Sequence, residues 1–86
     1  MATKNLRDVI CNQVARILCE ERKKRLISMT VLAQRAGLSQ SMISLVERDL
    51  RNSTLETLLR ICEVLEIDLA EILRKATAAA SKTRRS

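Results

Sequence analysis

The side chains most able to do chemistry in this sequence are three cysteines, Cys11, Cys19 and Cys62, because the chain contains no histidine and no tyrosine. A zinc site needs about four nitrogen or sulfur ligands at short paired spacings, and these cysteines, with no C-x-x-C pair among them, do not supply them. A glycine-rich phosphate-binding loop is also missing, since the chain has a single glycine. The usual catalytic groups are therefore nearly absent. We expect no enzyme activity, no metal, no cofactor and no small-molecule ligand, and we expect the cysteines to fill the core of a protein in a reducing cytoplasm.

The basic residues are the second group with a chemical consequence. The 16 lysines and arginines exceed the 10 acidic residues and give a net charge of +6, with a pI near 9.9, which suits a polyanionic partner. Five of the sixteen follow Leu73, which leaves eleven basic and ten acidic groups before it. Overall charge therefore does not establish DNA binding, which must be argued from local clusters such as residues 22–25.

The composition predicts one small helical domain. The 86 residues are 47% apolar and include no proline and no aromatic residue, so a core of Leu, Ile, Val, Ala, Met and Cys is expected. No apolar run has the length of a signal peptide or of a membrane span, which predicts a cytoplasmic, nucleoid-associated protein without membrane contact. We divide the chain into a domain over 1–75 and a basic C-terminal tail over 76–86. The alanines of this tail can extend the last helix, and its basic end is either a solvated extension or a DNA arm.

Five helices are expected from the spacing of the apolar residues. The first runs from about Leu6 to Arg25 and ends in a basic cluster that suits the negative end of the helix dipole. The fourth is predicted to begin at Ser53, which can form a capping box with Glu56. Its expected buried stripe is Leu55, Leu58, Leu59, Ile61, Cys62 and Leu65. The fifth is expected to open at Asp68.

Two short helices joined by a tight turn are predicted in the middle of the chain. Ser28 and Ser39 are the predicted N-caps, and the two helices cover Met29–Ala36 and Gln40–Asp49. Gly37, the only glycine, suits the left-handed residue that ends the first of them. Because only three residues separate these helices, they must cross steeply, which is the geometry of a helix-turn-helix.

A set of residues at fixed offsets accompanies this turn: Leu32, Ala33, Gly37, Leu38, Ser39, Ile43, Val46, Glu47, then residues 53–58 and Ile61. The set resembles the lambda-repressor/Cro-like helix-turn-helix proteins, also called the xenobiotic-response-element (XRE) family. The likeness covers about residues 10–73, with the helix-turn-helix at about 29–48. It implies an all-α, five-helix lambda-repressor-like DNA-binding domain. It also implies a structural ion pair between Arg22 and Glu47 that fixes the third helix against the first.

The resemblance further implies that the third helix enters the major groove with its first residues at base edges. The positions that match base readers are Gln40, Ser41, Ser44 and Leu45. Gln40 can bind an adenine edge in bidentate fashion, whereas Leu45 either meets a thymine methyl group or packs internally. The positions that match phosphate contacts are Thr30, Arg48, Arg51 and Asn52. The alternative for the arginines is a solvated surface.

Three positions depart from the family pattern. Met29 stands where the family often has a glutamine that contacts a phosphate, so Thr30 or the helix N–H groups must replace this contact. Leu26 stands where a glycine is usual, and Ser53 where many members have a proline. These departures leave the fold intact and remove one expected DNA contact.

Together the residues and the resemblance predict a sequence-specific transcriptional regulator that binds double-stranded DNA. It would be a repressor or autoregulator, for instance the controller of a restriction–modification or toxin–antitoxin operon. A homodimer on a palindromic operator is expected, because one half-site binds weakly and paired recognition helices must lie about 34 Å apart. The expected dimer interface is Leu69, Ile72 and Leu73.

Two further questions stay open in the sequence. The apolar residues at the start of the first helix, Leu6, Val9 and Ile10, need covering by either a partner or the fifth helix. The alternative function is a protein-interaction module, an antitoxin or anti-regulator on the same fold with little DNA readout. Met29 and Leu45 favour that alternative, since neither side chain can donate a hydrogen bond to DNA.

Overall fold

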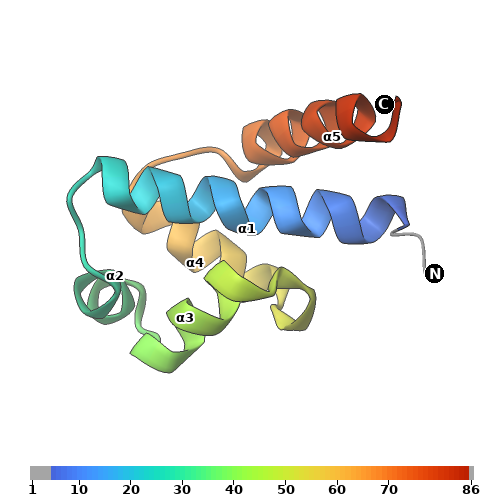
Figure 1. Cartoon of the computed structure of the whole chain (residues 1–86). Helices are drawn as coiled ribbons and strands as arrows, with labels where there is room; N and C mark the ends of the chain where they lie inside the picture. The colour runs from blue at the N-terminus through green and yellow to red at the C-terminus, as the bar shows by residue number, and fades with distance from the viewer. Residues whose placement is uncertain (1–4, 86) are drawn as a thin grey trace.

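The structure, a computed structural model, describes residues 5–85, except for the side chains of Asn52 and residues 83–85. This part of the chain forms five α-helices and one 3-10 helix: α1 (Leu6–Lys24), α2 (Met29–Ala36), α3 (Gln40–Arg48), η1 (Leu50–Asn52), α4 (Leu55–Leu65) and α5 (Leu69–Arg85). Helices α2, α3 and α4 lie on one side of α1, and α5 lies along its other side (Figure 1). The predicted all-α fold with five helices is confirmed.

The turn between α2 and α3 has the predicted construction. The Ser28 hydroxyl accepts a hydrogen bond from the Val31 N–H at 3.1 Å, and the Ser39 hydroxyl accepts one from the Met42 N–H at 3.1 Å. Gly37 ends α2 in the left-handed region, with φ 72° and ψ 34°. A side chain at this backbone angle is strained, whereas glycine adopts it freely. The local sequence therefore fixes where both helices begin and where the first one stops.

The prediction for the start of α4 was wrong by one residue. Ser53 follows the turn of η1 and donates its N–H to the Leu50 carbonyl at 2.9 Å, so the N-cap is Thr54, whose hydroxyl accepts the Thr57 N–H at 3.1 Å. The residues of α4 that are buried are Thr57, Ile61, Cys62 and Leu65. Leu55 and Leu59, which were expected in the buried stripe, are exposed.

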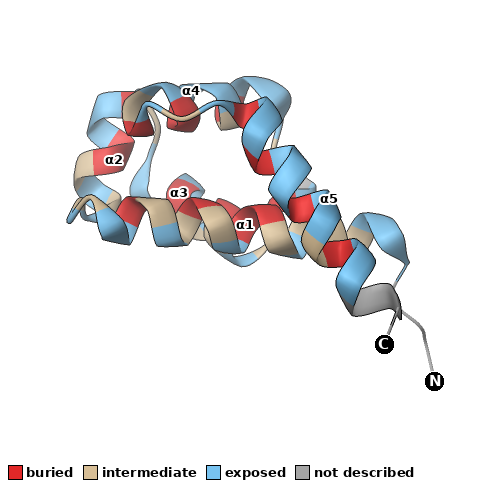
Figure 2. Ribbon diagram, turned by 90° about the horizontal axis from the view of Figure 1, so that it is seen from above, coloured by how far each residue is buried: buried red, intermediate tan, exposed pale blue. Residues whose placement is uncertain are grey.

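The core lies between α1 and the other four helices. Its largest fully buried side chains are Leu18, Leu32, Ile43, Ile61, Leu65, Val14 and Val46. Figure 2 shows the buried residues on the helix faces that are turned toward one another. Each helix contributes one apolar face to this core, which is the arrangement that the helical spacing predicts. Among the described residues, none of the helices combines the length and apolar character that crossing a bilayer requires.

Helix α5 packs along α1 over much of its length. Ala76 and Ala80 are fully buried, because their small side chains let the two helices approach closely. The helix passes through the expected boundary between residues 75 and 76 without a break and continues to Arg85. The expected tail up to Ala80 thus belongs to the packed unit, and Ser86 lies outside the described residues. Val9 and Ile10 of α1 are half-buried within the chain, whereas Leu6 is exposed.

Two non-glycine residues adopt left-handed backbone angles. Leu26, in the loop after α1, and Glu66, at the end of α4, both have φ 57°. An L-residue pays about 1–2 kcal/mol for this conformation. Leu26 gains nothing in return from burial, since its exposed fraction is 93%.

Candidate nucleic-acid interface

A buried ion pair joins the end of α1 to α3. Arg22 Nε donates to Glu47 Oε2 at 2.7 Å, and Arg22 Nη2 donates to Glu47 Oε1 at 3.1 Å. The third guanidinium nitrogen, Nη1, donates to the Ile27 carbonyl at 2.8 Å. The side chains are only 9% and 7% exposed, and the hydrogen bond that Arg22 donates to Glu47 raises the pKa of Arg22 above its ordinary value. The pair implied by the family resemblance is therefore present, and it fixes α3 against α1.

Helix α3 has one buried face and one exposed face. Ile43 and Val46 point into the core. On the other face Gln40, Ser41 and Leu45 are exposed, and Ser44 is half-buried. All four predicted base readers thus have access to solvent on one helix, and Leu45, 38% exposed, does not pack fully inside. The face offers few polar groups for reading base edges.

The exposed face of α3 also carries Met42, which sequence reasoning missed. Its side chain is 41% exposed, while that of its neighbour Ile43 is fully buried. The sequence contains two apolar pairs at helical spacing, 42 with 45 and 43 with 46. Only one of them can face the core, and nothing local shows which. Met42 and Leu45 together give this face an apolar strip that can meet thymine methyl groups.

The predicted phosphate contacts fall into different environments. Thr30 is exposed in the first turn of α2. Ser28 accepts the N–H of Val31 there, and the N–H groups that precede it in the helix can bind an anion. Met29 is half-buried and packs against the core. Arg48 is exposed and has no hydrogen bond or ion pair within the described part of the chain. The side chain of Asn52 lies outside the described residues.

Arg51 is already held by acidic side chains of the protein. Its Nε donates to Asp49 Oδ1 at 2.9 Å and its Nη2 to Asp49 Oδ2 at 3.1 Å. Its Nη1 lies 3.5 Å from Asp8 Oδ1 of α1. The hydrogen bonds from Arg51 lower the pKa of Asp49, and those contacts raise the pKa of Arg51. Arg51 therefore differs from Arg48 in having its charge matched within the subunit.

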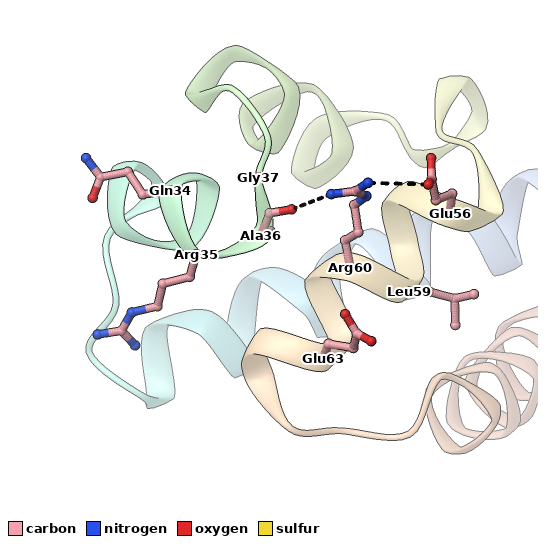
Figure 3. A pocket seen from close by; sticks show the side chains of 8 residues that line it. All are labelled: Gln34, Arg35, Ala36, Gly37, Glu56, Leu59, Arg60 and Glu63. Atoms are coloured by element: carbon pink, nitrogen blue, oxygen red, sulfur yellow. Dashed lines mark hydrogen bonds and ion pairs between the residues drawn. The ribbon is translucent and has the colours of Figure 1, made fainter.

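A contact from α4 supports the turn of the helix-turn-helix. Arg60 Nη1 donates to the carbonyl of Ala36, the last residue of α2, at 3.2 Å, and Nη2 donates to Glu56 at 3.4 Å (Figure 3). A Cβ atom on Gly37 would lie 3.0 Å from Arg60 Nη1. Arg60 thus satisfies a helix-end carbonyl, and its guanidinium would have to shift slightly if residue 37 carried a Cβ atom. Sequence reasoning missed it, because an arginine that binds a backbone carbonyl leaves no pattern of paired residues.

The residues expected at a dimer interface are not equally accessible. Leu69 and Ile72 are buried within the subunit, and only Leu73 is exposed, at 43%. The two leucines of α4 that were expected in the core, Leu55 and Leu59, are exposed as well. Of the three α5 residues expected at the interface, Leu73 alone is exposed.

The cysteines occupy two kinds of site. Cys62 is buried, and burial raises the pKa of its thiol to about 11. Cys11 and Cys19 are half-buried on α1. In residues 5–85 no three acidic, cysteine or histidine side chains come together as metal ligands. The thiol of Cys62 therefore stays protonated and acts as a small apolar side chain of the core.

The sequence matches the helix-turn-helix family over residues 20–72, which is more than half of the chain. No curated protein shows significant sequence similarity. Among solved structures, the wild-type restriction-modification controller protein C.Esp1396I is similar with a TM-score of 0.76 and 23% identity, over 85% of this chain and 95% of that chain. The clp gene regulator ClgR from Corynebacterium glutamicum is similar with a TM-score of 0.76 and 20% identity, over 98% of this chain and 85% of that chain. The chain belongs to the XRE-type helix-turn-helix family of DNA-binding transcriptional regulators.

Proposed function

We propose that this protein regulates transcription by reading the sequence of double-stranded DNA with the exposed face of α3. The proposal rests on the way in which α3 is packed and held in the fold. Its back is buried through Ile43 and Val46, and its end is fixed by the ion pair of Glu47 with Arg22. Gln40 and Ser41 stand exposed in its first turn, which is the part of a recognition helix that reaches base edges.

The chemistry of each side chain on this surface indicates whether it would contact bases or phosphates. Gln40 can form two hydrogen bonds with an adenine edge, and Ser41 and Ser44 can bind several bases. Thr30 at the start of α2 and Arg48 at the end of α3 flank the reading face and would bind phosphates. Because few of these groups discriminate strongly, DNA shape supplies part of the specificity.

A homodimer on a palindromic operator is the assembly that we propose. One small module with so few base contacts binds a half-site weakly, whereas two copies combine their affinities. The exposed leucines of α4 and α5, Leu55, Leu59 and Leu73, are large apolar side chains that a second copy can cover. Solved proteins of this fold include the controller C.Esp1396I and the regulator ClgR, which supports a repressor or autoregulator that acts on cytoplasmic DNA.

Selection of bound duplexes from a random library, followed by titration, tests this function. We expect an enriched palindrome, and we expect Gln40→Ala to reduce discrimination against a mismatched base by about 1–3 kcal/mol. Arg48→Ala should instead weaken binding to all sequences and lower the salt slope by about 0.9. Glu63→Gln, an exposed change on α4, serves as a control. Binding without any enriched sequence, or no binding at all, would favour the protein-interaction module instead.

A further inference from the structure

Arg51 is the one predicted phosphate contact whose guanidinium is bound on two sides by carboxylates. The contact with Asp49 is a fork-to-fork pair of 2.9 and 3.1 Å, the geometry in which an arginine also binds a phosphate. Asp8 approaches from α1, at 3.5 Å, although 43 positions separate it from Arg51 in the sequence. The edge of the guanidinium formed by Nε and Nη2 is therefore already occupied, although the side chain as a whole is 58% exposed.

Asp49 is itself held in place by the backbone. Its Oδ1 accepts the N–H of Arg51 at 3.2 Å, and its side chain caps η1. The carboxylate cannot turn away from Arg51 without giving up this cap. To bind Arg51 in this way, a phosphate would have to displace the two hydrogen bonds between Arg51 and Asp49. It would then lie next to two negative charges, those of Asp49 and Asp8.

We propose that Asp49, with Asp8 beside it, withholds Arg51 from the DNA backbone and so limits the affinity of the protein for DNA of unrelated sequence. This inference rests on the proposed DNA-binding function. Nonspecific binding comes almost entirely from basic side chains that neutralise phosphates. An arginine that stays paired with carboxylates of its own chain adds nothing to this nonspecific affinity. Asp49 thus determines specificity without contacting DNA, because the ratio of specific to nonspecific affinity decides occupancy in a genome.

The contrast with Arg48 makes the inference measurable. Arg48 lies three positions earlier, is exposed, and has no acidic partner among the described residues. Each arginine that binds a phosphate contributes about 0.9 to the slope of log affinity against log salt. Arg48 should contribute this amount in the wild type, and Arg51 should contribute it only when Asp49 has lost its charge.

The test uses the full chain and a short labelled duplex without the selected operator, titrated between about 50 and 200 mM salt. The key variant is Asp49→Asn, since asparagine keeps an oxygen that can accept the Arg51 N–H and cap η1. Arg51→Ala and the double variant Asp49→Asn with Arg51→Ala complete the cycle. Glu63→Gln removes the same single charge from an exposed carboxylate of α4. Far-UV circular dichroism of each variant checks that the helices are retained.

We expect Asp49→Asn to steepen the slope of log affinity against log salt by about 0.9. Raising the salt concentration fourfold should therefore weaken DNA binding by this variant about 3.5-fold more than binding by the wild type. Arg51→Ala alone should leave the slope unchanged, and the double variant should behave like the Glu63→Gln control. An unchanged slope in Asp49→Asn, or a loss of slope in Arg51→Ala equal to that in Arg48→Ala, would overturn the inference while leaving the proposed function intact. A wild type that does not bind duplex DNA at any salt would overturn the proposed function itself.

Discussion

Replacing Arg22 by methionine should be among the most destabilising single changes in this protein. Methionine keeps an unbranched apolar stem but removes the guanidinium, so Glu47 loses both of its hydrogen bonds from Arg22 and the Ile27 carbonyl loses its donor. Because the Glu47 side chain is only 7% exposed, water cannot fully replace these partners. Leaving one buried charge unpaired costs about 3–5 kcal/mol. A domain of this size has a total stability of about 4–13 kcal/mol, so Arg22→Met should lose a large share of it.

Chemical denaturation followed by far-UV circular dichroism measures this loss, since the chain has no aromatic residue to serve as a fluorescent probe. Arg16→Met is the matched control, because Arg16 pairs with Glu20 on the surface of the same helix, with exposed fractions of 69% and 60%. It should change the free energy of unfolding by less than about 1 kcal/mol. The double variant Arg22→Met with Glu47→Leu should recover most of the stability, because it leaves no charge unpaired. If Arg22→Met were no more harmful than Arg16→Met, the claim that this pair fixes α3 would be wrong.

Three further predictions concern the backbone and the pH dependence of stability. Leu26→Gly should raise the free energy of unfolding by about 0.5–1 kcal/mol, since relief of the left-handed backbone outweighs the entropy that glycine loses; a decrease in denaturation midpoint would contradict this. Gly37→Ala should lower the free energy of unfolding by about 1–2 kcal/mol, because the φ of 72° is strained for alanine and the new Cβ would press on Arg60. The hydrogen bond from Arg25 lowers the pKa of Glu21 below its ordinary 4.5, so this pair stabilises the fold above pH 4.5 and the gain is lost as the pH falls through the folded pKa. Thermal unfolding of Glu21→Gln should accordingly depend less on pH in the acid range than that of the wild type, and identical profiles would contradict the assignment.

The sequence predicted the helix-turn-helix because its signals are local. The hydroxyls of Ser28 and Ser39 and the backbone of Gly37 contact residues three or four positions away. A pattern of residue types therefore suffices to place them. The start of α4 was misplaced for the same reason, since Ser53 and Thr54 are adjacent candidate caps. The extra turn of η1 before them decides between the two.

The features that escaped prediction depend on distant parts of the chain. The alanines of the expected tail were recognised as able to extend the last helix, but the burial of Ala76 and Ala80 was not anticipated, because small side chains show no preference for a core until α1 lies against them. The pairing of Arg51 with Asp8 was not anticipated, because Asp8 comes beside it only in the folded chain. The exposure of Met42 was not anticipated, because the packing of α3 decides which of its apolar residues face the core. In each case the environment is created by packing, which neither composition nor spacing specifies.

The central claim is that the exposed face of α3 is the surface that meets DNA. An NMR titration of the isotope-labelled protein with the selected duplex tests it directly, because the backbone amide signals report contact residue by residue. We predict that the largest shifts fall on residues 40–45 and on the first turn of α2, with small changes along the exposed side of α4. Shifts concentrated on α4 and α5, with the α3 signals unmoved, would contradict the account.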